Sequence, residues 1–109
     1  MNAEIEFKIQ HSYPALFNDS MMTDLVKASA SHLLGEENVL VLHKPTLGTE
    51  DFSYFLEKVQ GSFYQLGIGN SKLGTEYPLH SGHFNIDESA LPLAAAVHAQ
   101  VAMDYLKKR

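Results

Sequence analysis

A short apolar run at residues 39–42, Val-Leu-Val-Leu, most constrains how this chain can fold. Because polar residues do not alternate with the apolar ones, the run is typical of a strand covered on both faces, as in a parallel α/β sheet. Residues 62–68 predict another strand by their apolar and aromatic content. Residues 3–10 alternate between apolar and polar side chains, which predicts a half-buried strand.

Helical patterns separate these strands. Residues 18–20, Asn-Asp-Ser, are all good N-caps for a helix at residues 20–34, and Gly35 is expected to end it. A second helix is expected at about residues 50–59, with Thr49 as its cap. Its expected inner face consists of Phe52, Phe55, Leu56 and Val59.

The last helix is expected to start at Asp87 or Ser89 and to run to about Lys107. After the linker at residues 11–19, the order of elements is therefore αβαβα, which indicates the α/β class. The two central strands are expected to lie parallel. Two strands alone make a poor sheet, because independent stability usually needs three or more, or good helix cover.

Composition excludes several classes of function. The chain has 109 residues, 45% of them hydrophobic, and a net charge of −5. This size fits one domain, and the acidic balance argues against a nucleic-acid or anionic-membrane surface. The basic run at residues 107–109 is interpreted as a solvated helix end. With no cysteine, no apolar leader and no apolar run of about 20 residues, we expect a soluble, cytoplasmic protein without disulfides.

Residues 77–88, Tyr-Pro-Leu-His-Ser-Gly-His-Phe-Asn-Ile-Asp-Glu, hold the best candidates for chemistry. His80 lies in a loop before a helix, from which a neutral imidazole can reach a metal ion. A surface or packed histidine is the alternative, and a lone histidine by itself favours it. His83 is interpreted as a bystander, because its spacing from His80 defines no common face on a loop. The adjacent Glu50 and Asp51 either line a cleft or favour a helix N-terminus, and we prefer the second reading.

Four blocks of sequence, taken in order, resemble one family. They are residues 13–19, residues 47–52 with Leu-Gly-Thr-Glu-Asp-Phe, residues 63–70 with Leu-Gly-Ile-Gly, and residues 79–92 with Leu-His-Ser and a later Leu-Pro. The family is that of the metal-dependent amidohydrolases, which include aminoacylases, hippurate hydrolases and indole-acetyl-amino-acid hydrolases. Gly82 departs from the pattern, since many relatives have proline there.

The resemblance implies an architecture and a reaction. Residues 1–12 would be the last strand of a lid (dimerisation) domain. Residues 13–109 would be the C-terminal αβαβα portion of a metallopeptidase-type catalytic domain. The complete enzymes hydrolyse N-acyl amino acids or related amides, with two zinc or manganese ions that activate a water molecule. By this resemblance His80 matches the last metal ligand. The N–H groups of Gly48 and Thr49 could bind a substrate carboxylate.

The resemblance also implies what this chain lacks. The family's His-x-Cys-Gly-His-Asp segment and its Glu-Glu pair, which supplies the general base, lie upstream of the matched region. We therefore expect no catalytic residue here, no stoichiometric metal and no activity for the chain alone. The alternative is a stand-alone binding or interaction module of the same origin, and the flanking reading frame would distinguish the two. In either case, a homo-oligomer formed through the N-terminal strand is expected to be possible.

Overall fold

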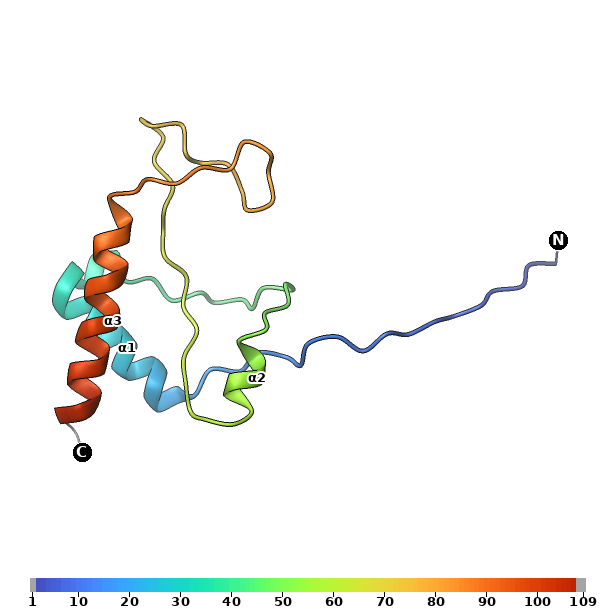
Figure 1. The fold of residues 1–109 in the computed structure, drawn as a ribbon, viewed down its shortest axis with the longest axis horizontal. Coiled ribbons are helices and arrows are strands. Elements are labelled where there is room, and N and C mark those ends of the chain that lie inside the picture. Colours follow the sequence, from blue (N-terminus) through green and yellow to red (C-terminus); the bar gives the residue numbers. More distant parts are fainter. Residues whose placement is uncertain (1, 108–109) are drawn as a thin grey trace.

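The computed structural model describes residues 2–107, and two long helices form its packed body. Helix α1 spans Ser20–Leu34 and helix α3 spans Ala90–Lys107, and the two lie side by side (Figure 1). A 3-10 turn, η1 at Glu36–Asn38, follows α1. Helix α2 at Ser53–Leu56 is a single short turn. Residues 1, 108 and 109, with the outer limits of the predicted domains and most of the basic run, lie outside the described residues.

Both ends of α1 are formed as the sequence predicts. The carboxylate of Asp19 accepts a hydrogen bond from the backbone N–H of Met22 at 2.9 Å, which satisfies one of the free donors of the first turn. Gly35 follows the helix with φ 89°, a conformation that side chains other than glycine rarely adopt. The predicted last helix is also confirmed, beginning at Ala90 and ending at Lys107.

The core lies between α1 and α3 and is small. Its buried apolar members are Leu25, Ala30, Ala90 and Val97. One buried polar group crosses it: the Ser29 hydroxyl, 2% exposed, donates to the Asp104 carboxylate at 2.8 Å. Because a buried hydroxyl must find a partner, this bond fixes how the two helices meet.

The second helix is shorter than predicted, and its predicted cap is wrong. Phe52, not Thr49, precedes α2, and it makes no side-chain cap bond. Two residues of the expected inner face, Phe55 and Val59, are 64% and 62% exposed. The prediction of a longer helix from the apolar spacing relied on a sheet that would cover this face. No sheet is present in residues 2–107 to bury that face, so the helix keeps only one turn.

The three predicted strands have extended backbone but no ladder of hydrogen bonds in the described part of the chain. Residues 62–68 run alongside α3 (Figure 1), where the rings of Tyr64 and His98 lie 5.6 Å apart. Residues 39–42 leave the body, and Leu40 is 84% exposed. The α/β class and the parallel sheet therefore stay predictions.

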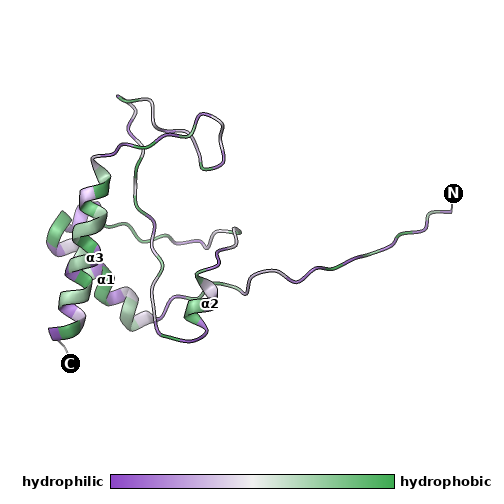
Figure 2. Cartoon of the chain, in the orientation of Figure 1, coloured by the Kyte–Doolittle hydropathy of each residue, from purple (hydrophilic) through white to green (hydrophobic). Residues whose placement is uncertain are grey.

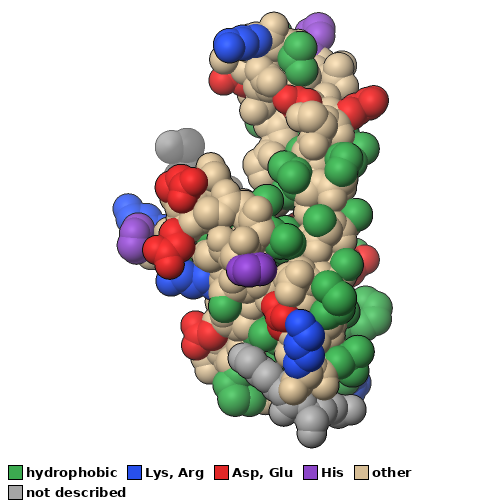
Figure 3. All heavy atoms as spheres, turned by 90° about the vertical axis from the view of Figure 1, so that its left-hand side faces the viewer, with side chains coloured by type: hydrophobic (Ala, Val, Ile, Leu, Met, Phe, Trp, Pro, Cys, Tyr) green, Lys and Arg blue, Asp and Glu red, His purple; other side chains and the backbone are tan. Residues whose placement is uncertain are grey.

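The described chain is open in shape. Its radius of gyration is 18.4 Å and its extents are 65 × 41 × 21 Å, whereas a compact domain of this length has a radius of about 13 Å. Apolar residues recur along the extended segments and not only in the helices (Figure 2). Hydrophobic side chains are also spread over the face at the helical end (Figure 3). Much apolar surface therefore remains uncovered.

Candidate functional site

The loop that carries the predicted site is closed at its base by Asp87. The Asn70 side-chain amide donates to the Asp87 carboxylate at 2.6 Å, and the Asp87 N–H donates to the Ile68 carbonyl at 2.9 Å. Inside this neck, Thr75 is 4% exposed, and its hydroxyl accepts the Asn70 N–H at 2.9 Å. The two ends of the loop are thus held together next to the start of α3.

His80 lies in a tight turn within this loop. The Ser81 N–H donates to the Pro78 carbonyl at 3.1 Å, which makes His80 the third residue of the turn. Its φ is 68°, whereas the other described residues with positive φ are glycines. This conformation matches a type II turn, where glycine or asparagine is usual. For an L-residue it costs roughly 1–2 kcal/mol. The side chain is exposed.

His83, three residues after His80, packs against a neighbouring aromatic ring. Its ring lies 5.4 Å from that of Tyr77, so it packs on a neighbouring aromatic side chain. Its backbone N–H donates to the Ser81 hydroxyl at 3.2 Å. The contact gives His83 a structural role in the loop.

Hydrogen bonds shift the pKa of Asp87, and burial shifts the pKa of Tyr64. Bonds from the Asn70 amide and from Ser89 lower the pKa of Asp87, because they favour its charged form. Burial raises the pKa of Tyr64. The Tyr64 hydroxyl is buried and has no hydrogen-bond partner among residues 2–107. The ionised Asp87 therefore stabilises the neck of the loop at neutral pH.

Gly48 and Thr49 belong to the loop before α2, and Figure 1 shows that this loop and the loop of residues 70–87 are separate segments of the chain. Both are exposed, and α2 starts only at Ser53. A side chain at Gly48 would meet no atom within 4 Å. The described residues show no hydrogen bond or ring contact that joins this loop to the His80 turn.

A complete metal site is not present in the part of the chain that the structure describes. No three His, Cys, Asp or Glu side chains in residues 2–107 come close enough to hold an ion. Catalytic zinc typically needs three protein ligands and one open position. His80 offers one imidazole, so these residues by themselves do not fit a catalytic ion, and we derive no reaction step through one.

Comparison with known proteins shows which family the chain belongs to. Residues 2–104 match peptidase family M20/M25/M40. The chain belongs to this family. The resemblance to aminoacylases and hippurate hydrolases, noted from four sequence blocks, is thereby confirmed.

Several curated M20/M25/M40 relatives are similar to the chain. It is 39% identical to an IAA-amino acid hydrolase ILR1-like 6 of Arabidopsis thaliana, covering 89% of this chain and 21% of that protein. It is 38% identical to thermostable carboxypeptidase 1 of Saccharolobus solfataricus, covering 96% and 25%. It is 29% identical to the hippurate hydrolase of Campylobacter jejuni, covering 95% and 26%. The chain thus spans about a quarter of the length of these relatives. No solved structure matches it.

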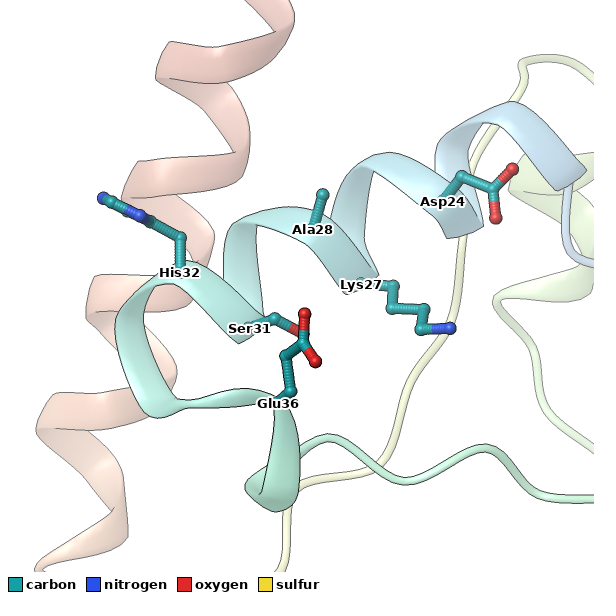
Figure 4. A pocket seen from close by; sticks show the side chains of 6 residues that line it. All are labelled: Asp24, Lys27, Ala28, Ser31, His32 and Glu36. Carbon is teal, nitrogen blue, oxygen red and sulfur yellow. The ribbon is translucent and has the colours of Figure 1, made fainter.

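Two pockets in the described part of this M20/M25/M40 chain lie away from the His80 loop. One, with a volume of about 420 Å³, follows α1 and is lined by Asp24, Lys27, Ala28, Ser31, His32 and Glu36. In Figure 4 the imidazole of His32 points away from the carboxylate of Glu36, so the lining groups do not converge. The second pocket, of about 390 Å³, lies between residues 17–19 and 56–61. None of the predicted site residues lines either pocket.

Sequence reasoning missed the neck of the loop. Asp87 is predicted as a possible start of the last helix and as a carboxylate of the candidate stretch at residues 77–88, and it does accept the Ser89 N–H at 3.0 Å. Its second partner, Asn70, is 17 residues away, so no local sequence pattern predicts this hydrogen bond. An Asn at the end of a strand and an Asp before a helix would be the signal to look for. No helix within residues 2–107 is long and apolar enough to span a membrane.

Proposed function

We propose that this chain is the C-terminal part of a metal-dependent amidohydrolase that cleaves N-acyl amino acids, with His80 as one metal ligand of the complete enzyme. The observation that carries the proposal is the family match over residues 2–104. The printed names of the relatives, IAA-amino acid hydrolase and hippurate hydrolase, favour amide bonds to amino acids as the substrate class. The cytoplasmic location stays a prediction.

The geometry of His80 supports its assignment. A left-handed residue other than glycine is uncommon, and such conformations gather at functional sites. The turn presents an exposed imidazole, and the Asn70–Asp87 bond closes the loop beneath it. When bound, a divalent ion would activate water. This chain's own part is to hold one imidazole in place, with the Gly48 and Thr49 N–H groups available for a substrate carboxylate.

A chimera tests the role of His80. Residues 2–104 would replace the matching segment of thermostable carboxypeptidase 1, which is 38% identical over 96% of this chain. We expect the chimera to hydrolyse hippurate or N-acetyl-methionine, and His80→Ala to lower kcat/KM by about a thousandfold or more because one ligand is lost. Zinc content of the purified protein is the second readout.

His83→Ala is the matched control, because it removes the other imidazole of the same loop. We expect it to leave zinc content unchanged and to change kcat/KM by less than about threefold, which is about 0.65 kcal/mol. Equal losses for both variants would show that the loop, and not the His80 ligand, is needed. Full activity of His80→Ala in a folded, zinc-loaded chimera would refute the assignment.

A second candidate function is a stand-alone interaction module built from the same fold. The exposure of Leu40, Val41 and Leu42, at 84%, 59% and 65%, favours a surface that another chain covers. An upstream reading frame that encodes His-x-Cys-Gly-His-Asp would support the enzyme, and its absence would support the module.

A further inference from the structure

The loop at residues 76–86, which carries the exposed imidazole of His80, leads into the start of α3 (Figure 1). In the described part of the chain, the hydrogen bonds of this loop join its own residues, as the Ser81 N–H does with the Pro78 carbonyl at 3.1 Å. The ring contact of His83 is also with a residue of the loop. The position of the loop relative to α3 therefore depends on how its two ends are held.

The two ends meet at the neck. The Asn70 amide donates to the Asp87 carboxylate at 2.6 Å, and the Asp87 N–H donates to the Ile68 carbonyl at 2.9 Å. On the other side, the Thr75 N–H donates to the Asn70 carbonyl at 3.1 Å. Asn70 thus contacts both ends of the loop, and its side chain makes the bond that reaches the residue before α3.

The polar atoms of the Asn70–Asp87 pair are matched in donor and acceptor. The side-chain oxygen of Asn70 accepts the Lys72 N–H at 3.0 Å, while its NH₂ group donates to one carboxylate oxygen of Asp87. The other carboxylate oxygen accepts the Ser89 N–H at 3.0 Å. Neither side chain can turn over without losing a hydrogen bond, because the amide has one acceptor end and one donor end.

We propose that Asn70 and Asp87 are positioning residues, which hold the His80 turn at a fixed place relative to the start of α3. A bond between an amide and an ionised carboxylate is stronger than one between neutral groups. It ties the loop to a helix that belongs to the packed body, so the helix gives the turn a fixed support. The proposal rests on the proposed function in one respect, since it takes His80 as the group that has to be positioned.

Exchanging the two side chains tests the pair. Asn70→Asp places a second carboxylate against Asp87. Asp87→Asn sets two amides together, which costs either this bond or the one from Lys72. In the double variant with both substitutions, the carboxylate at position 70 accepts from the Lys72 N–H and from the amide at position 87. The oxygen of that amide still accepts the Ser89 N–H, so every bond returns with donor and acceptor reversed across the neck.

Nuclear magnetic resonance on the 109-residue chain measures the loop directly. We expect backbone order parameters of about 0.85 at Leu79, His80 and Ser81 in the wild type, and below about 0.6 in each single variant. The Thr75 N–H should exchange with solvent about tenfold faster in each single variant, because the neck opens locally. The Val97 N–H, in the core between α1 and α3, should exchange at the wild-type rate in every variant.

Asn85→Asp and Glu88→Gln are the matched controls, because they make the same two chemical changes at exposed residues beside the pair. Both should leave the loop as in the wild type, and the double variant should match the wild type as well. Order parameters that stay high in both single variants, a double variant as loose as the single ones, or an equal acceleration at Val97 would each overturn the proposal.

The carboxypeptidase chimera adds a functional readout. Each single variant should lower its kcat/KM by about tenfold and the double variant should restore it, because the effect passes through the position of His80. The two controls should leave kcat/KM unchanged. A loosened loop with unchanged kcat/KM would overturn the positioning role. The loop measurements need neither metal nor substrate, so an inactive wild-type chimera would count against the proposed function while they still decide whether the pair holds the turn.

Discussion

At the scale of single residues, the bond between Ser29 and Asp104 shows how a polar pair specifies the packing of two helices. Ser29 is almost fully buried, and its partner carboxylate also accepts from the Gln100 side chain at 2.9 Å. Alternative alignments of α1 and α3 would leave the buried hydroxyl without an acceptor, which costs more than a lost contact between apolar groups.

We therefore expect Ser29→Ala to lower the free energy of unfolding by about 1 kcal/mol, because it removes the hydroxyl that donates to Asp104. Thermal or urea unfolding followed by circular dichroism measures this change. Ser31→Ala is the control on the same helix, since Ser31 is only half-buried. Equal unfolding midpoints for the two variants would show that the interhelical bond contributes nothing.

At the scale of elements, the start of α3 and the end of the extended segment before the loop are joined through Asp87. Its carboxylate binds the N–H of Ser89 at the helix start and the amide of Asn70 across the neck. These bonds lower the pKa of Asp87 from its ordinary value of 3.8. Asp104 is shifted in the same direction, by its bonds from Gln100 and Ser29.

The lowered pKa of Asp87 makes the stability of the chain depend on pH. A carboxyl whose pKa is lower when folded adds stability above its unfolded pKa, and the stability is lost as pH falls through the folded value. We expect the melting temperature of the chain to drop as pH falls below about 4, and Asp87→Asn to make this drop shallower. Glu88→Gln, at the exposed neighbouring residue, should leave the acid dependence as in the wild type. An identical acid profile for Asp87→Asn would contradict the role of this carboxylate.

At the scale of the whole molecule, the described residues are open in shape and bury few apolar side chains. Its radius of gyration is 18.4 Å, and its core apolar side chains are Leu25, Ala30, Ala90 and Val97. The predicted strands lie exposed or only partly covered, and His80 stands without further ligands in the described residues. Residues 2–107 therefore form neither the predicted sheet nor the predicted metal site by themselves.

The purified 109-residue chain should therefore contain well under one equivalent of zinc and should not hydrolyse hippurate or N-acetyl-methionine. One imidazole binds zinc weakly, and among residues 2–107 no group of three His, Cys, Asp or Glu side chains that could hold a metal ion is present. Metal analysis and an amidohydrolase assay check both points. Near-stoichiometric zinc, or turnover that a chelator removes, would contradict the expectation that the chain is incomplete by itself.

The sequence by itself determined the features that depend on near neighbours. The cap at Asp19, the stop at Gly35 and the span of α3 follow from side chains within a few residues of each other, so periodicity and capping chemistry predicted them. The family could also be recognised from short blocks of residues. These features do not require the rest of the molecule to be in place.

Tertiary structure alone decided the rest. The length of α2 depends on whether a sheet covers Phe55 and Val59, and the neck of the loop depends on Asn70 meeting Asp87 across 17 residues. The left-handed turn at His80 likewise results from how that loop closes, since nothing in the local sequence demands positive φ at a histidine. Periodicity records which face of an element is apolar, but only the surrounding chain determines whether anything covers it.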